Sequence, residues 1–142
     1  YASRGLSALV FRGANTGLDE LTTTDANQVW LVSGGAVVET TFDARESLGM
    51  ASSSIEDLAG GEAAENAAVA RDVLSGGGAD AVRDAVALNV GAGILAWEGL
   101  DNPVTQADFE QRIRGAVERA LAALADGSGA RLVERWVAAS NA

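Results

Sequence analysis

Hydrophobic and polar positions divide the chain into a strand-like first part and a helical second part. Residues 6–11 form a short, nearly continuous apolar run, which is typical of a strand covered on both faces. Residues 28–32 and 36–42 are two β-rich runs on either side of a Ser-Gly-Gly turn, and they predict a hairpin. The chain up to residue 42 is therefore expected to form a small amount of β structure.

From residue 54 onward, apolar side chains recur at the spacing of helices. The pattern predicts helices over 62–74 and 80–97, a third after Pro103 and a fourth from Ser128. The 80–97 segment is apolar nearly all round, so we expect it to be the most buried helix. In the first helix one face is shared by Ala63, Ala67, Ala70 and Leu74. The inner stripe expected for the third helix consists of Phe109, Ile113, Val117, Ala120 and Leu124, with Glu110 and Arg114 as an i,i+4 pair on its outer side. The fourth helix carries Leu132, Val133, Trp136 and Val137.

The order of these elements, strands first and helices after, predicts the α+β class rather than alternating α/β. We find no internal repeat and no low-complexity linker, so residues 1–142 are interpreted as one domain. It combines short N-terminal strands and a hairpin with a layer of about four helices. A hydrophobic content of 48% is enough for a core, and the three tryptophans are spaced like members of it.

The charge balance bears on possible partners. The ten basic residues are all Arg and face twenty acids, which gives a formal net charge of −10. Nucleic acids are bound mainly by cations that neutralise phosphates, so we do not expect a nucleic-acid partner. No apolar run approaches the ~20 residues that span a membrane, and we expect no membrane partner. The chain opens on Tyr1 rather than Met, which leaves open where its gene begins.

The residue types that are missing limit the possible chemistry. The sequence contains no His, no Lys and no Cys. This excludes imidazole bases, His-ligated zinc, Ser-His-Asp triads, Schiff-base lysines, thiolate nucleophiles and disulfides. The absence of Cys fits a reducing compartment, and we expect a cytoplasmic protein. Any chemistry has to use carboxylates, Arg, hydroxyls or backbone amides.

The adjacent acids Asp19 and Glu20, in the sequence GLDELTTT after the first apolar run, are the leading candidate site. Mg²⁺ prefers oxygen ligands, usually one or two carboxylates completed by water and substrate phosphates. Spacing alone leaves two interpretations open, a metal site or a polar turn. The hydroxyls of Thr22–Thr24 could support this loop or belong to a strand edge, and the edge is favoured. Asn89 is expected to bond to backbone nearby.

A second candidate is the Gly60-Gly61 turn at the start of a helix. Such turns can bind anions through free backbone N–H groups. Here Glu62 and Glu65 follow in the first turn, where they suit the helix dipole but repel a phosphate. A tight turn that starts a helix is therefore favoured over a phosphate site.

Four segments together resemble the C-terminal portion of the anthranilate phosphoribosyltransferases, members of the nucleoside phosphorylase/phosphoribosyltransferase family. In chain order they are ALVFRG, GLDELTTT, LAGGEAAENAAVARDVLSG and RDAVALNVGAGI, spanning about Ala8 to Ile94. The resemblance implies that the chain is part of a larger α/β catalytic domain. It implies transfer of a phosphoribosyl group from phosphoribosyl pyrophosphate to anthranilate, a step of tryptophan biosynthesis, by a glycosyltransferase that is homodimeric when complete.

The resemblance also assigns a role to the acid pair. In the family this pair binds a magnesium ion, so Asp19 and Glu20 are implied Mg²⁺ ligands, and neither is an acid–base catalyst. The family's glycine-rich pyrophosphate loop, its lysine segment and most of its helical domain have no counterpart here, so the chain alone is expected to be inactive. The link before the acids is one residue longer than the family's usual link. The alternative is a non-catalytic binding or assembly module that retains the fold.

Overall fold

The computed structural model describes residues 1–142, and its first part is a three-stranded antiparallel sheet in the order β1-β2-β3. The strands are β1 (Ala8–Gly13), β2 (Asn27–Ser33) and β3 (Ala36–Phe42). Gly34 and Gly35 form the turn between β2 and β3 with φ of 56° and 78°, which only glycine adopts freely in this two-residue hairpin. The predicted hairpin is confirmed.

The sheet has one covered face and one open face. Val29 and Leu31 of β2 are buried on the inner face, while Arg12 on the outer face donates from Nε to Oε1 of Gln28 at 3.1 Å. Val10 of β1 is 38% exposed, so the expectation that the first strand is covered on both faces is wrong. A continuous apolar run is compatible with two-sided burial but does not supply the second covering layer.

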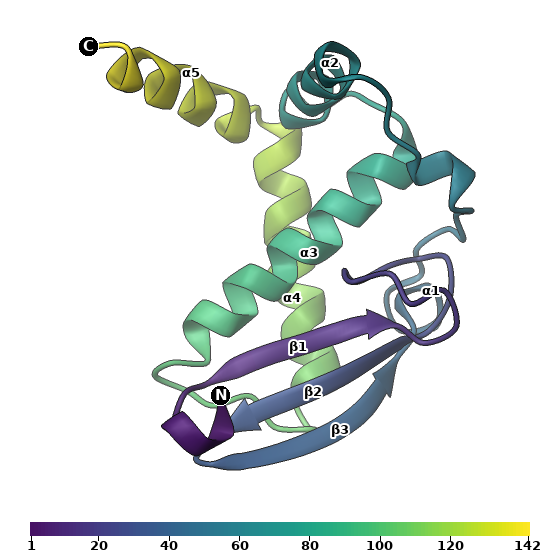
Figure 1. Cartoon of the computed structure of the whole chain (residues 1–142), viewed down its shortest axis with the longest axis vertical. Coiled ribbons are helices and arrows are strands. Elements are labelled where there is room, and N and C mark those ends of the chain that lie inside the picture. Colours follow the sequence, from purple (N-terminus) through teal and green to yellow (C-terminus); the bar gives the residue numbers. More distant parts are fainter.

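The helices follow the strands, as predicted. They are α1 (Ala44–Leu48), α2 (Ala63–Leu74), α3 (Asp80–Glu98), α4 (Phe109–Ala125) and α5 (Ser128–Ser140), with 3-10 turns at Ala2–Arg4 and Glu56–Leu58. The short helix α1 was not predicted, and the four longer ones are confirmed. Figure 1 shows α3 and α4 crossing beside the sheet, with α2 and α5 at the opposite end of the molecule.

The core lies where α3, α4 and the sheet meet. The predicted inner stripe of α4 is confirmed, because all five of its residues are buried. Phe109 of α4 packs edge-on against Phe42 of β3, with ring centroids 5.4 Å apart and an interplanar angle of 81°. Gly91 allows α3 to approach α4 closely, because a Cβ there would lie 2.6 Å from Cγ2 of Val117.

Several predicted helix faces are not buried. α3 is not the most buried helix, since it buries five residues and α4 buries six. Trp97 on α3 and Trp136 on α5 are 75% and 73% exposed. Trp30 is half-buried on the outer face of the sheet, so none of the three tryptophans belongs to the core. In α2 only Val73 is buried, and in α5 no residue is. Periodicity identifies an apolar face, but whether anything covers that face depends on the tertiary structure.

The expected pair between Glu110 and Arg114 is not formed. The Arg114 guanidinium instead donates from Nη2 to the carbonyl oxygen of Ser47, which ties α4 to the end of α1. No helix combines the length and the apolar character needed to cross a membrane.

Candidate functional site

The acid pair lies in the loop that leaves β1. Asp19 and Glu20 are both exposed, and neither carboxylate takes part in a hydrogen bond or an ion pair. Both line an open groove of about 540 Å³ between this loop and α3, whose other walls include Leu58, Val82 and Val86. Two free carboxylates therefore stand at the edge of a largely apolar groove.

The main chain directly after the acid pair is held by two asparagine side chains. The N–H of Leu21 donates to Oδ1 of Asn89 at 3.0 Å, and Nδ2 of Asn89 donates to the carbonyl oxygen of Leu21 at 2.8 Å. Asn27 makes the same two bonds to Thr22, at 2.8 and 2.9 Å. Asn89, expected to bond to backbone nearby, also donates to Ala85 at 3.0 Å, but its main partner is distant in sequence. The loop is fixed from both α3 and β2.

The three threonines support this loop and do not form a strand edge, so that preference is wrong. Thr22 and Thr24 share a hydroxyl–hydroxyl bond of 2.9 Å, and the N–H of Thr24 donates to Oγ1 of Thr22 at 3.0 Å. Thr23 is buried and its hydroxyl bonds to Oγ of Ser53 at 2.8 Å. A run of hydroxyl residues has the same β propensity in either setting, so the sequence did not distinguish them.

Asp25 closes the turn that precedes the acid pair. Its Oδ2 accepts from the N–H groups of Asn15 and Thr16 at 2.6 and 3.0 Å, and Oδ1 accepts from the Thr16 hydroxyl at 3.2 Å. Burial favours the neutral acid, but these hydrogen bonds outweigh it and lower the pKa of Asp25. The N–H of Gly13 donates to the carbonyl oxygen of Leu18 at 2.8 Å, so the link from β1 folds into a closed turn.

Arg45 joins this loop to α1. Its Nη1 donates to the carbonyl oxygen of Thr24 at 3.4 Å, and its Nε donates to Oδ1 of Asp43 at 2.8 Å. The side-chain hydrogen bond from Arg45 lowers the pKa of Asp43 to about 2. Sequence reasoning missed Asp25, Asn27, Asp43 and Arg45, because each acts through a contact formed only in the folded chain. The polar Asn27 at the head of an apolar run was the one available signal.

The acid pair fits one kind of metal site. No cluster of three or more His, Cys, Asp or Glu side chains occurs in the molecule, so a cage made only of protein ligands is not built. Mg²⁺ commonly uses one or two carboxylates and completes its shell with water and phosphate oxygens. Asp19 and Glu20, which are uncommitted and adjacent, fit that pattern, whereas Asp25 is already bonded to its own loop.

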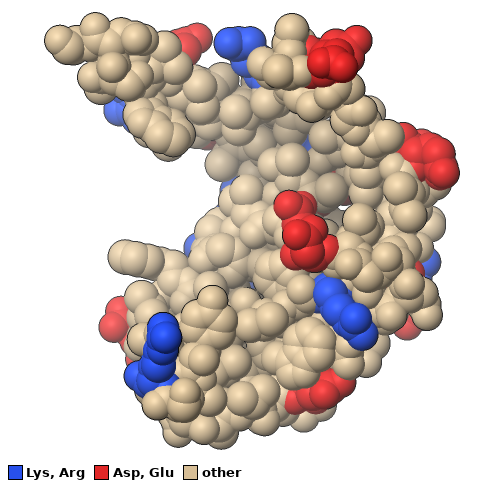
Figure 2. Space-filling model, in the orientation of Figure 1, with Lys and Arg blue, Asp and Glu red and all other residues tan.

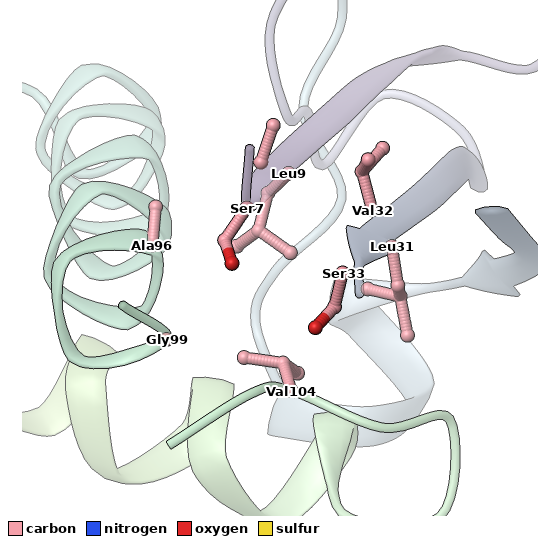
Figure 3. A pocket seen from close by; sticks show the side chains of 9 residues that line it. Ser7, Leu9, Leu31, Val32, Ser33, Ala96, Gly99 and Val104 are labelled. Carbon is pink, nitrogen blue, oxygen red and sulfur yellow. The ribbon is translucent and has the colours of Figure 1, made fainter. Parts of the chain in front are cut away.

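Two other features do not compete as sites. Gly61 is held at both N–H and carbonyl by the Asn66 side chain, each at 2.9 Å, and Glu65 caps the N–H of Glu62, so the Gly60-Gly61 turn starts a helix as predicted. A cavity of about 10 Å³ lies between the sheet and the end of α3. Figure 3 shows its lining, with Ser7 and Ser33 facing Ala96 and Val104; it has room for about one water molecule.

Comparisons with known proteins cover almost the whole chain. The model of the glycosyl transferase family, a/b domain, matches residues 3–130. The anthranilate phosphoribosyltransferase of Nocardia farcinica is 46% identical over 144 residues, covering 99% of this chain and 40% of the relative. The anthranilate phosphoribosyltransferase of Arthrobacter sp. strain FB24 is 47% identical, and the match covers 96% of this chain and 37% of that relative. The chain thus spans about 40% of the length of these curated relatives.

Solved structures show the same fold. The crystal structure of anthranilate phosphoribosyltransferase from Thermus thermophilus superposes with a TM-score of 0.76 at 33% identity, covering 96% of this chain and 36% of that one. The Saccharomyces cerevisiae enzyme in complex with PRPP and Mg gives a TM-score of 0.73 at 19% identity, covering 90% and 33%, and this likeness concerns the fold alone. The chain belongs to the glycosyl transferase family, through its a/b domain.

Proposed function

We propose that this chain is the C-terminal portion of an anthranilate phosphoribosyltransferase, and that Asp19 and Glu20 are its magnesium ligands. In this reaction the amine of anthranilate displaces pyrophosphate from C1 of the phosphoribosyl group. Bound Mg²⁺ would neutralise charge on the leaving pyrophosphate. The two carboxylates hold the ion and do not transfer protons. We further propose that the complete enzyme is a cytoplasmic homodimer and that residues 1–142 belong to one catalytic domain.

The observation that carries the proposal is the contrast within one loop. Every polar side chain from Thr22 to Asp25 is engaged in hydrogen bonds, whereas Asp19 and Glu20 make none and face the groove. A loop that is fixed by its neighbours and leaves two carboxylates free is preorganised for a cation. The substrates are those of the anthranilate phosphoribosyltransferases that this chain resembles, and the yeast enzyme was solved in complex with PRPP and Mg.

The chain alone does not hold all the contacts that such a substrate needs. It contains no lysine, and the Gly60-Gly61 turn is filled by Glu65 and Asn66. We therefore propose that residues 1–142 do not convert anthranilate by themselves. Turnover of anthranilate by the purified chain with phosphoribosyl pyrophosphate and MgCl₂ would contradict this part of the proposal.

A fusion with a relative tests the function directly. In the hybrid, this chain replaces the matching region of the Nocardia farcinica enzyme and is joined to the upstream part of that enzyme. We expect this hybrid to be active. Asp19→Asn and Glu20→Gln should each lower kcat/KM by roughly 100-fold or more, because a charged ligand of the leaving group is lost. The control is Asp101→Asn, an exposed acid outside the groove, which should leave the rate unchanged.

Three results would count against the proposal. An active hybrid that keeps its rate in both acid variants would show that the pair is not the metal site. Titration of the 142-residue chain with Mg²⁺ gives a second test. If the Asp19→Asn and Glu20→Gln variants bind Mg²⁺ with the same affinity as the parent, the pair is not the metal site. A complete lack of binding would favour a non-catalytic module with the family fold.

A further inference from the structure

We infer that Asn89 of α3 and Asn27 of β2 are positioning residues for the acid pair. They hold the peptide groups that follow Glu20 and so fix where the two carboxylates stand over the groove. This inference rests on the proposed magnesium role of Asp19 and Glu20, and it assigns to two further residues the geometry of that site.

Each asparagine side chain bonds to both the N–H and the carbonyl of one loop residue, as a residue of a neighbouring strand would. A carboxamide offers an acceptor oxygen and two donor hydrogens, which matches the N–H and carbonyl of one extended residue. Asn89 makes this pair with Leu21 at 3.0 and 2.8 Å, and Asn27 makes it with Thr22 at 2.8 and 2.9 Å. The backbone after Glu20 is therefore bonded to α3 through Leu21 and to β2 through Thr22.

Neither carboxamide is free to turn. The remaining N–H of Asn89 donates to the carbonyl oxygen of Ala85 at 3.0 Å, within its own helix. The remaining N–H of Asn27 donates to the carbonyl oxygen of Phe42 at 3.2 Å, at the end of β3. Asn27 is completely buried, and Asn89 lines the groove beside the acids. The positions of Leu21 and Thr22 are thus set by α3 and the sheet, which both contribute to the core.

The same device elsewhere in the chain provides a matched control. Asn66 of α2 holds the N–H and carbonyl of Gly61, each at 2.9 Å, next to the start of that helix. Its removal takes away the same two backbone bonds but leaves the acid loop untouched. Comparing variants of Asn89 and Asn66 therefore separates the general loss of stability on removing such a pair of hydrogen bonds from a change in the position of Asp19 and Glu20.

The test compares the parent chain with its Asn89→Ala and Asn66→Ala variants. MnCl₂ serves as the probe, with free Mn²⁺ followed by electron paramagnetic resonance and displaced by MgCl₂. Removal of a group that orients metal ligands typically weakens affinity by about 10- to 100-fold, so Asn89→Ala should raise the Kd for Mn²⁺ roughly ten-fold. Asn66→Ala should leave it unchanged. Amide exchange at Leu21 should accelerate in Asn89→Ala only.

The outcomes separate this inference from the proposed function. A parent that binds Mn²⁺ through Asp19 and Glu20, with equal affinity in Asn89→Ala, overturns the positioning role and leaves the metal site. Equal weakening by Asn89→Ala and Asn66→Ala also overturns it, because the effect is then general. A parent that binds no Mn²⁺ overturns both. If Asn89→Ala does not fold, amide exchange in the parent chain tests the positioning role instead. Exchange of the Leu21 and Thr22 amides at the rate of an unprotected loop would show that the two asparagines do not fix this backbone.

Discussion

At the scale of single residues, the carboxylates near the acid loop fall into two groups. Asp25 and Asp43 accept hydrogen bonds that fix a turn and the start of α1, and their pKa values are lowered by those bonds against the opposing effect of burial. Asp19 and Glu20 accept none. The first group therefore contributes to folding in its charged form, and the second makes no contact that does so.

Acid sensitivity follows from the first group. The pKa of Asp43 falls from 3.8 to about 2 on folding, mainly through the hydrogen bond from Arg45. A lowered folded pKa gives stability that is present above pH 3.8 and is lost as the pH falls toward 2. Asp43→Asn retains a good helix cap but loses the ion pair, so we expect a free energy of unfolding lower by about 1–2 kcal/mol at pH 7. Urea unfolding from pH 7 to pH 3 should show the difference narrowing; a constant difference would contradict this.

The position of Asp19 and Glu20 in an exposed loop was predictable, because they follow a strand-like run and precede hydroxyl residues. The hydrogen bonds from Asn89 and Asn27 that fix the backbone after them were not predictable. The partner of Leu21 is 68 residues away in Asn89, and the burial of Asn27 depends on the end of β3. Local sequence carries propensity and capping, whereas a side chain that bonds to distant backbone is determined by the packing of whole elements.

At the scale of elements, the buried face of a helix could be predicted only where apolar residues were confined to one side of it. The inner stripe of α4 was identified because its other side is charged, and all five stripe residues are buried. In α3 apolar residues occupy every side, and the buried face runs through Ala87, Leu88, Gly91, Ala92 and Leu95, while Val90 and Trp97 are exposed. A helix that is apolar all round does not reveal which side will be covered first.

The close crossing of α3 and α4 can be tested through two glycines of α3. A Cβ at position 91 would lie 2.6 Å from Cγ2 and 3.0 Å from the backbone N of Val117, so Gly91→Ala forces the helices apart. We expect a loss of roughly 1–3 kcal/mol, despite the better helix propensity of Ala. Gly93→Ala meets nothing within 4 Å and should stabilise by up to about 1 kcal/mol. Thermal melts of both variants check this, and stabilisation by Gly91→Ala would refute the crossing.

At the scale of the whole molecule, much apolar surface is uncovered. Figure 2 shows charged side chains scattered singly over one face, with wide uncharged areas between them. Leu132, Trp136 and Val137 of α5 are 56%, 73% and 53% exposed, and Trp97 projects from α3. Exposed apolar side chains of this kind favour association, while the net charge of −10 opposes it at low salt.

The chain is therefore expected to self-associate as salt screens its charge. Sedimentation velocity should show species larger than a 14.4 kDa monomer, increasing with NaCl concentration. Leu132→Glu with Trp136→Glu should shift the distribution toward monomer without unfolding, because no residue of α5 is buried. Ala138→Glu, on the side of α5 that carries Glu134, adds the same kind of charge and should have less effect. A monomer at every salt concentration would show that this surface does not associate.

The exposure of α5 also has a consequence for how the molecule opens. An isolated helix of 13 residues is marginal in water, and α5 gains little from tertiary packing because it buries no side chain. Its backbone amides should lose protection well below the free energy of global unfolding. A protease should accordingly remove residues beyond Gly127 first and leave the sheet with α3 and α4 as a resistant product. The last helix is then the part of this chain that loses its order first.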